Sequence, residues 1–197
     1  MEQVTFKDIK KSKEVNAYIY KGNSTLGVLG YTDHSAEHAV KVSSMAGKIL
    51  ECLGYGGHTV ELAKIAGYMH DIGNCVNRLD HPHSGALMAH QILRDMKMDY
   101  EDIAVIINAI GMHDEKSGGA VDTVSAALIL ADKTDVRRDR VRNQNKAAFD
   151  KHDRVNYAVE ESNAELSEDH TSLILNLKLD TKISPVIDYF EIFLDRM

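Results

Sequence analysis

Histidine is unevenly distributed along this chain of 197 residues, and its distribution is the first indication of chemistry. Eight of the ten histidines fall in one segment: His34, His38, His58, His70, His81, His83, His90 and His113. Scattered surface histidines would not be expected to bunch so tightly, whereas imidazole is a common ligand of transition metals. The bunching therefore indicates a metal centre.

The adjacent pair His70-Asp71 is the central motif of that segment. It follows an apolar run and is closed by Gly73, which we expect to allow the chain to turn. A neutral imidazole beside a carboxylate suits a hard or borderline divalent cation. Neighbouring residues on a helix point about 100° apart, so the pair converges on one ion most easily where a helix ends. The dipeptide is common, and it becomes informative only if further ligands lie on both sides of it.

One further candidate ligand precedes the pair in the sequence, and another follows it. His38 precedes His70 by 32 residues, and Asp132 follows Asp71 by 61 residues. Asp132 ends an apolar run, where a buried carboxylate is costly unless it is paired or bound to a cation. Two histidines and two aspartates give a four-ligand set of nitrogen and oxygen donors with room for water. That set suits Mn, Fe, Co, Ni or Zn, with Mg as a further candidate, better than calcium.

The elements that must position these residues are mostly helical. Apolar residues at three- and four-residue spacing predict helices over residues 5–20, 32–53, 59–70, 82–96, 99–113, 121–143 and 184–194. Thr32 or Asp33 is an expected N-cap, as is Asp99. Residues 22–24 are expected to form a loop. Alternating residues over 155–159 and 173–179 predict two short strands joined by the acidic stretch 160–169. The expected fold class is all-α, with a small two-stranded antiparallel β-ribbon near the C-terminus.

The composition excludes several classes of protein. With 44% hydrophobic residues, the chain can bury one substantial core, so residues 1–197 are expected to form a single domain. A net charge of −7 argues against nucleic-acid or membrane binding. The N-terminus lacks the layout of a signal peptide, and the two cysteines are too few for a disulfide framework. Free thiols and a cytoplasmic location are expected.

With these ligands assembled, the chain resembles the HD superfamily of metal-dependent phosphohydrolases. The pattern of that family is a first histidine, the His-Asp pair and a distant aspartate, and here it covers roughly residues 31–143. The helix phases agree as well as the ligands: His38-xxx-Val42, Leu53-Gly54, His70-Asp71-Ile72-Gly73, His81-xxx-Gly85, and Ile107 to Ile110 before His113. The resemblance implies an HD-domain-like helical bundle with its core in 31–143. Residues 150–197 would then form the ribbon and the final helix.

Carried over position by position, the resemblance implies a primary ion held by four residues: His38, His70, Asp71 and Asp132. In members with two metals, positions like His81 and His113 help to hold the second ion. With one ion, which we expect here, these two histidines would contact phosphate or transfer a proton. Two positions depart from the family: Asn74 replaces a common lysine, and Asp114 replaces the second histidine of a frequent His-His pair.

Two alternatives remain open among the histidines. His34 competes with His38 for the first ligand, since residues four apart share a helix face. We favour His38 because its helix phase fits, and we expect His34 to line the pocket. His81 competes similarly with His83, and His81 is preferred through its spacing to Gly85.

A basic cluster follows directly on Asp132. Lys133 or Arg137, within about one helical turn of the ligand, could grip a substrate phosphate. The alternative is a solvated helix face on which the arginines pair with Asp135 and Asp139. The two readings are evenly balanced on the sequence alone.

The function predicted from these residues is hydrolysis of a phosphate ester, with a nucleotide or a related phosphorylated small molecule as substrate. The catalytic candidates are Asp71, His81, His113 and Lys133. Two other hypotheses share the scaffold: a di-iron oxygenase, which needs a complete second site, and a non-catalytic ligand-binding regulatory module. The apolar faces of the ribbon and of the last helix could serve a homodimer.

Overall fold

The computed structural model describes residues 4–114 and 117–193, the side chain of Phe193 excepted. Seven helices form the larger part: α1 (Phe6–Lys11), α2 (Lys13–Val28), α3 (Ala36–Cys52), α4 (Gly57–Met69), α5 (His81–Asp95), α6 (Tyr100–Gly111) and α7 (Thr123–Thr134). Between them lies the short 3-10 helix η1 (Ile72–Cys75). The C-terminal part contains η2 (Arg138–Arg140), η3 (Lys146–Ala148), α8 (Lys151–Ala158), β1 (Val159–Leu166), β2 (Leu173–Leu179) and α9 (Val186–Phe193).

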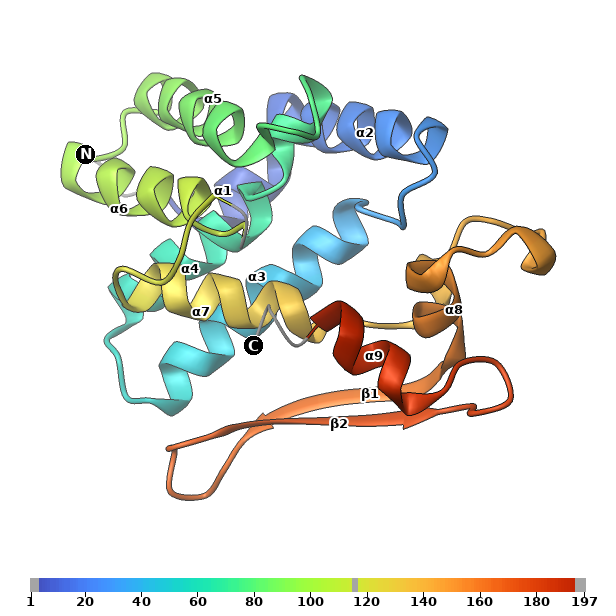
Figure 1. Cartoon of the computed structure of the whole chain (residues 1–197). Coiled ribbons are helices and arrows are strands. Elements are labelled where there is room, and N and C mark those ends of the chain that lie inside the picture. The colour runs from blue at the N-terminus through green and yellow to red at the C-terminus, as the bar shows by residue number, and fades with distance from the viewer. Residues whose placement is uncertain (1–3, 115–116, 194–197) are drawn as a thin grey trace.

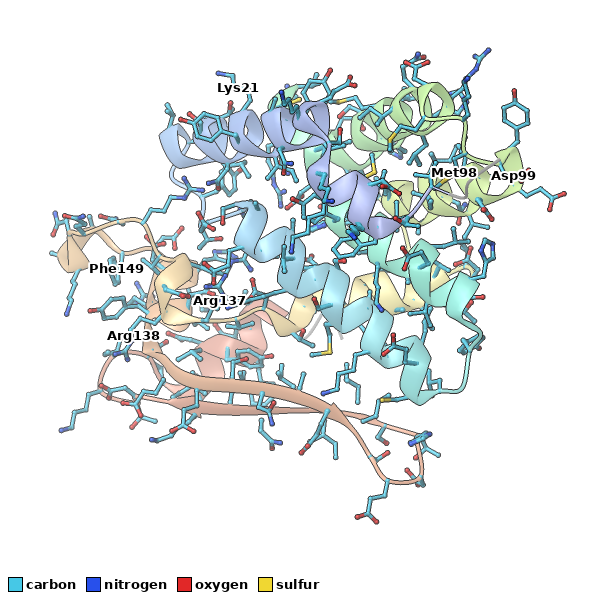
Figure 2. The ribbon with its side chains drawn as sticks, turned by 180° about the vertical axis from the view of Figure 1, so that it is seen from behind. Lys21, Met98, Asp99, Arg137, Arg138 and Phe149 are labelled. Atoms are coloured by element: carbon cyan, nitrogen blue, oxygen red, sulfur yellow. The ribbon has the colours of Figure 1, made fainter. Side chains whose placement is uncertain are left out.

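The helices are arranged in layers around α3. Helix α3 packs against both α4 and α7, α5 pairs with α6, and α2 lies against η1 (Figure 1). Viewed from behind, Met98 and Asp99 mark the α5–α6 link on one side, with Phe149 on the opposite side (Figure 2). The main apolar core is formed by residues of the helices from α1 to α7. A smaller apolar cluster lies under the ribbon: Val136, Val155, Val159 and Tyr189. The predicted class, all-α with a C-terminal two-stranded ribbon, is confirmed.

Several helix starts follow from capping side chains. The carboxylate of Asp99 accepts a hydrogen bond from the backbone of Glu101 at 2.9 Å, as predicted. Helix α3 is capped by Ser35, two to three residues later than expected, while Asp33 accepts a hydrogen bond from the Ser35 hydroxyl at 2.5 Å. A capping side chain and the residue that supports it together fix the start of α3.

The predicted helix over 5–20 is present but divided in two, and the predicted loop at 22–24 was wrong. The chain breaks at Ser12, whose hydroxyl caps α2, and α2 then continues to Val28. Gly22 lies inside α2, where a Cβ would come within 3.1 Å of the Cys75 backbone nitrogen. This glycine therefore allows a close helix crossing and does not form a turn.

The predicted long helix over 121–143 ends early, at Thr134. The Thr134 hydroxyl donates to the carbonyl of Ala131 at 2.7 Å, and Asp135 leaves helical geometry. The carbonyl of Asp135 accepts a hydrogen bond from the Arg140 guanidinium at 2.7 Å, which replaces the helical N–H. A side-chain contact from just beyond the helix thus accompanies its end, which was not predicted from the sequence.

The predicted strand over 155–159 was also wrong. Those residues lie mostly in α8, which is capped by Asp150. The prediction failed because a pattern of only three alternating residues is also compatible with one helical turn. The acidic stretch expected to be a loop forms β1, which pairs antiparallel with β2 from Val159↔Leu179 to Leu166↔Leu173. The predicted strand 173–179 and the last helix are present, although Leu194 of that helix lies outside the described residues.

Candidate metal centre

The end of α4 places His70 and Asp71. His70 is the C-cap of α4 and keeps helical backbone angles, and Asp71 is the N-cap of η1, so the two residues lie where one helix ends and the next begins. Gly73 has a different role from the one expected: positive φ among the described glycines occurs at Gly30 and Gly54. A Cβ on Gly73 would collide with the His81 carbonyl oxygen. The glycine therefore lets the start of α5 approach the centre closely.

Asp71 lies at the middle of the site and presents its two oxygens to two different groups. Its Oδ2 faces Nε2 of His70 at 3.3 Å, Nε2 of His38 at 3.8 Å and Nε2 of His34 at 3.9 Å. From α7, Oδ1 of Asp132 lies 3.2 Å from Nε2 of His38 and 3.7 Å from Nε2 of His70. Residues from α3 and the segment before it, from the junction of α4 with η1, and from α7 therefore converge on one point.

The far side of each imidazole is held by an acceptor. Nδ1–H of His70 donates to the Gly67 carbonyl at 2.8 Å, and Nδ1–H of His38 donates to the Asp135 carboxylate at 2.8 Å. In the neutral imidazoles, these hydrogen bonds favour the tautomer whose Nε2 lone pair points into the centre. This is the arrangement that supports histidine ligands in metal sites.

Two of the converging atoms lack a hydrogen-bond partner. Nε2 of His38 and Nε2 of His70 are buried among the described residues without one. Nitrogen atoms buried beside two carboxylates in this way need either a proton or a metal cation between them and the oxygens. Nε2 of His38, Nε2 of His70 and a carboxylate oxygen of Asp132 also lie within 4.8 Å of one another. The donor set therefore fits a divalent transition metal.

The pKa values of the site show how strongly the groups interact. Burial alone would lower the pKa of His70, but the charges of Asp71 and Asp132 raise it to about 9. Burial would raise the pKa values of the two aspartates, but the histidines hold both well below their usual range. Burial lowers the pKa of His113 to about 4. The centre therefore contains two charged carboxylates close to imidazoles with different protonation states.

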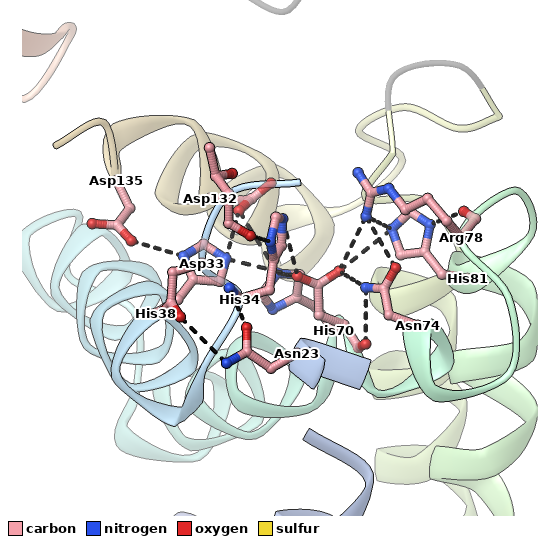
Figure 3. A network of polar contacts seen from close by, with 12 residues as sticks. Asn23, Asp33, His34, His38, His70, Asn74, Arg78, His81, Asp132 and Asp135 are labelled. Atoms are coloured by element: carbon pink, nitrogen blue, oxygen red, sulfur yellow. Dashed lines mark hydrogen bonds and ion pairs between the residues drawn. The ribbon is translucent and has the colours of Figure 1, made fainter. Parts of the chain in front are cut away.

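The Oδ1 side of Asp71 has its own group of residues. Nε2 of His81 lies 3.4 Å and Nε2 of His113 lies 4.0 Å from this oxygen, and the two nitrogens are 3.2 Å apart. The amide of Asn74 donates to the same oxygen at 2.7 Å. The guanidinium of Arg78 lies 3.8 Å from it (Figure 3). The carboxylate therefore joins the predicted metal ligands to a second cluster of polar groups.

Both clusters open into one cavity of about 600 Å³. One wall contains Tyr31, Arg78 and His81, and the opposite wall comes from the C-terminal part: Asp150, His152, Asp153 and Asn156. This volume is typical of a site for a small ligand. The residues of α8 were not predicted to face the site, because no helix was expected there and residues 155–159 were expected to form a strand.

The structure places most of the predicted site residues at this cavity: His34, Asp71, His81, His113, Asp114, Asp132 and Lys133 line it. Four predicted residues do not line it: His38 and His70 are buried at the metal centre, and His83 and Arg137 lie outside the site. His83 is exposed and pairs with Asp80 at 2.6 Å. The Arg137 guanidinium contacts Asp135 at 2.7 Å and Glu37 at 3.1 Å. These contacts agree with the ion-paired interpretation of that arginine.

Sequence reasoning missed two residues that support the site. Asp135 orients His38, although it was considered only as an ion-pair partner of the basic cluster. Its spacing of three from Asp132, at the end of the same apolar run, was the available signal. Arg78 carried no signal, because its contact with Asp71 depends on the path of the loop after η1.

Comparisons with known proteins were made on sequence and on structure. A family model described as HD domain matches residues 35–167. An uncharacterized protein of Methanocaldococcus jannaschii is 29% identical over 163 residues, which make up 71% of this chain and 62% of that protein. Ribonuclease Y of Enterococcus faecalis is 32% identical over 105 residues, 53% of this chain and 18% of the ribonuclease. A crystal structure of a predicted HD superfamily hydrolase from an uncultured Thermotogales bacterium gives a TM-score of 0.49 at 22% identity, covering 64% of this chain and 68% of that one. The chain therefore spans less than two thirds of the length of the archaeal protein and under a fifth of the ribonuclease.

Proposed function

Because the chain belongs to the HD domain family, we propose that it is a metal-dependent phosphohydrolase acting on a phosphorylated small molecule, with a nucleotide as the preferred class. The observation that carries the proposal is the convergence of His38, His70, Asp71 and Asp132 with two unpartnered imidazole nitrogens among them. These four residues would hold the ion. Mn, Fe, Co, Ni and Zn all accept such a mixed set of donors, and Mg is a further candidate.

The chemistry divides between the ion and the surrounding side chains. When bound, the ion supplies a Lewis acid that polarises a phosphoryl oxygen and lowers the pKa of a water. His81 and His113 each keep Nδ1 bonded to a backbone carbonyl, so Nε2 can accept or return a proton at the reacting group. Lys133, which follows the ligand Asp132 on the cavity wall, would bind a substrate phosphate.

A nucleotide matches the cavity in size and in the apolar residues that line part of its wall. The volume of about 600 Å³ lies in the range of small-ligand sites. The ring of Tyr31 is half-exposed on one wall, and Leu29 and Leu79 extend the apolar surface beside it. An aromatic ring can stack on a base while the phosphate reaches the polar end.

A panel of substrates tests the proposal. Phosphomonoesters, deoxynucleoside triphosphates, dinucleoside polyphosphates and cyclic dinucleotides would each be assayed with Mn, Fe, Co, Ni, Zn and Mg. Phosphate release is expected from at least one class. Asp132→Asn should lower it by on the order of 100-fold or more, because the ion loses a charged ligand. Asp139→Asn, which changes an exposed carboxylate seven residues further along the chain, is the matched control. Full activity in a folded Asp132→Asn protein would refute the assignment.

A second candidate is cleavage of an RNA phosphodiester, favoured by the similarity to ribonuclease Y. The net charge of −7 and the acidic α8 wall argue against extended contact with a polyanion. Adding a short oligoribonucleotide to the panel separates the two. Faster cleavage of the oligoribonucleotide than of every small substrate would replace the first proposal with the second.

A further inference from the structure

Arg78 brings a permanent positive charge to the Oδ1 side of Asp71. Its Nη1 lies 3.8 Å from Oδ1 of Asp71 and 3.3 Å from Nε2 of His81. The side chain is 28% exposed, so it faces the cavity but is largely enclosed. Guanidinium groups remain charged at all working pH values.

Several contacts hold this guanidinium in place (Figure 3). Nη1 of Arg78 donates to the amide oxygen of Asn74 at 3.2 Å, and the amide nitrogen of Asn74 in turn donates to Asp71. The guanidinium also lies over the ring of Tyr31, 5.6 Å from its centroid. The backbone carbonyl of Arg78 accepts Nδ1–H of His81 at 2.9 Å. The backbone and the guanidinium of Arg78 therefore both contact the imidazole of His81.

The atoms around this guanidinium form a donor set of the kind that holds a divalent ion. His81 Nε2 lies 3.4 Å from Asp71 Oδ1, 3.2 Å from His113 Nε2 and 3.8 Å from an Asp114 carboxylate oxygen. Nη1 of Arg78 already contacts the imidazole nitrogen of His81 as a donor and neutralises part of the carboxylate charge. A divalent ion among the same atoms would lie within a few ångströms of the guanidinium, and two cations at such separation repel strongly.

We propose that Arg78 takes the place of a second metal ion, so that the centre binds one ion per chain. This inference rests on the proposed metal centre. The guanidinium supplies the second positive charge beside Asp71, and its remaining N–H groups are available to a substrate phosphate from the cavity. A single-ion centre also has no place for the paired irons of an oxygenase.

Ion counting tests the inference without any assay of activity. The full chain would be dialysed against Mn²⁺, and bound manganese would be measured by elemental analysis and by electron paramagnetic resonance. We expect one ion in the wild type and one in Arg78→Lys, which keeps the charge. We expect two in Arg78→Ala and in Arg78→Gln, with the spectrum of magnetically coupled manganese. Arg138→Ala is the matched control, because Arg138 also stacks on a tyrosine but lies outside the cavity.

Each result decides between the proposals. Two ions in the wild type, or one ion in folded Arg78→Ala and Arg78→Gln, would overturn the inference and leave the metal centre standing. Circular dichroism and thermal unfolding identify which variants are folded. A wild-type chain that holds no ion after separate dialysis against Mn²⁺, Co²⁺ and Zn²⁺ would overturn the proposed function, and the inference with it.

Discussion

At the scale of single residues, the orientation of His38 depends on Asp135. The carboxylate of Asp135 is buried and accepts Nδ1–H of His38, while two arginines keep it charged. Burial would raise the pKa of Asp135, but the hydrogen bond from His38 and the charge of Arg140 hold it far below its usual range. The proposed ligand is therefore aligned by a partner that is itself firmly ionised.

Asp135→Asn is expected to lower metal affinity by roughly 10- to 100-fold, since the amide holds the imidazole less firmly than the carboxylate. The measurement is a competition titration with a chelator of known affinity. Asp139→Asn removes an exposed carboxylate that contacts Arg137 and should leave the affinity unchanged. Equal affinities for the two variants would show that Asp135 does not support the ligand.

Protonation of His70 should make metal binding depend on pH. The charges of Asp71 and Asp132 outweigh burial and raise its pKa to about 9, so His70 is protonated at pH 7.5. That proton must leave before Nε2 can bind an ion, so binding should release about one proton per chain and weaken as the pH falls. Above pH 9 the release should disappear. Calorimetry in buffers of different ionisation enthalpy measures it, and a heat that does not depend on the buffer would contradict the expectation.

At the scale of elements, the junction of η1 with α5 determines how close His81 comes to Asp71. Gly73 makes this possible because its missing side chain leaves room for the backbone of α5. Beyond the collision with the His81 carbonyl, a Cβ would lie 2.6 Å from the Gly85 backbone nitrogen. Backbone atoms cannot move aside as the end of a flexible side chain can.

Gly73→Ala should therefore destabilise the protein by roughly 1–3 kcal/mol, the usual range for overpacking, and should displace His81. Chemical denaturation measures the first effect, and the second appears as a changed imidazole signal in NMR spectra. Gly57→Ala is the control, because a Cβ at Gly57 meets no atom within 4 Å and lies in the first turn of α4. If both substitutions had the same small effect, the close approach would not be required.

How much of the site could be predicted from the sequence depended on the kind of signal. The proposed ligands were found because residue type, spacing and helix phase agreed at His38, His70 and Asp132. Helix caps such as Asp99 were found because capping is local. The end of α7 and the fold of 155–166 were missed, since the first depends on Arg140 and the second on pairing with β2. Arg78 was missed because its contact with Asp71 depends on the path of the loop after η1.

At the scale of the whole molecule, the centre joins elements that are far apart in sequence. The proposed ligands come from α3, from the end of α4 and from α7, and these helices also pack directly on one another. This binding site forms only when the chain is folded. The free energy of ion binding would therefore add to the stability of the fold. Within the described residues, no helix combines the length and apolar character needed to cross a membrane.

Removing the metal is expected to lower the melting temperature. At a free ion concentration of 100 times the Kd, binding contributes about 2.7 kcal/mol. For a chain of this size that corresponds to roughly 5–10 °C. Differential scanning calorimetry with and without a chelator measures the change. In Asp132→Asn, the chelator should change the melting temperature much less. A change of the same size as in the wild type would contradict the assignment of Asp132 as a ligand.

The acidic wall formed by α8 has a consequence for how fast substrate arrives. An anionic substrate approaches a chain of net charge −7 and passes the exposed Asp150 before it reaches the cations deeper in the cavity. Salt screens this repulsion, so kcat/KM should rise as ionic strength increases from about 0.01 M to 0.1 M. Asp150→Asn keeps the cap of α8 and should raise kcat/KM at low salt while weakening the response to salt. A rate that fell with salt in both proteins would mean that attraction near the metal governs the encounter from the start.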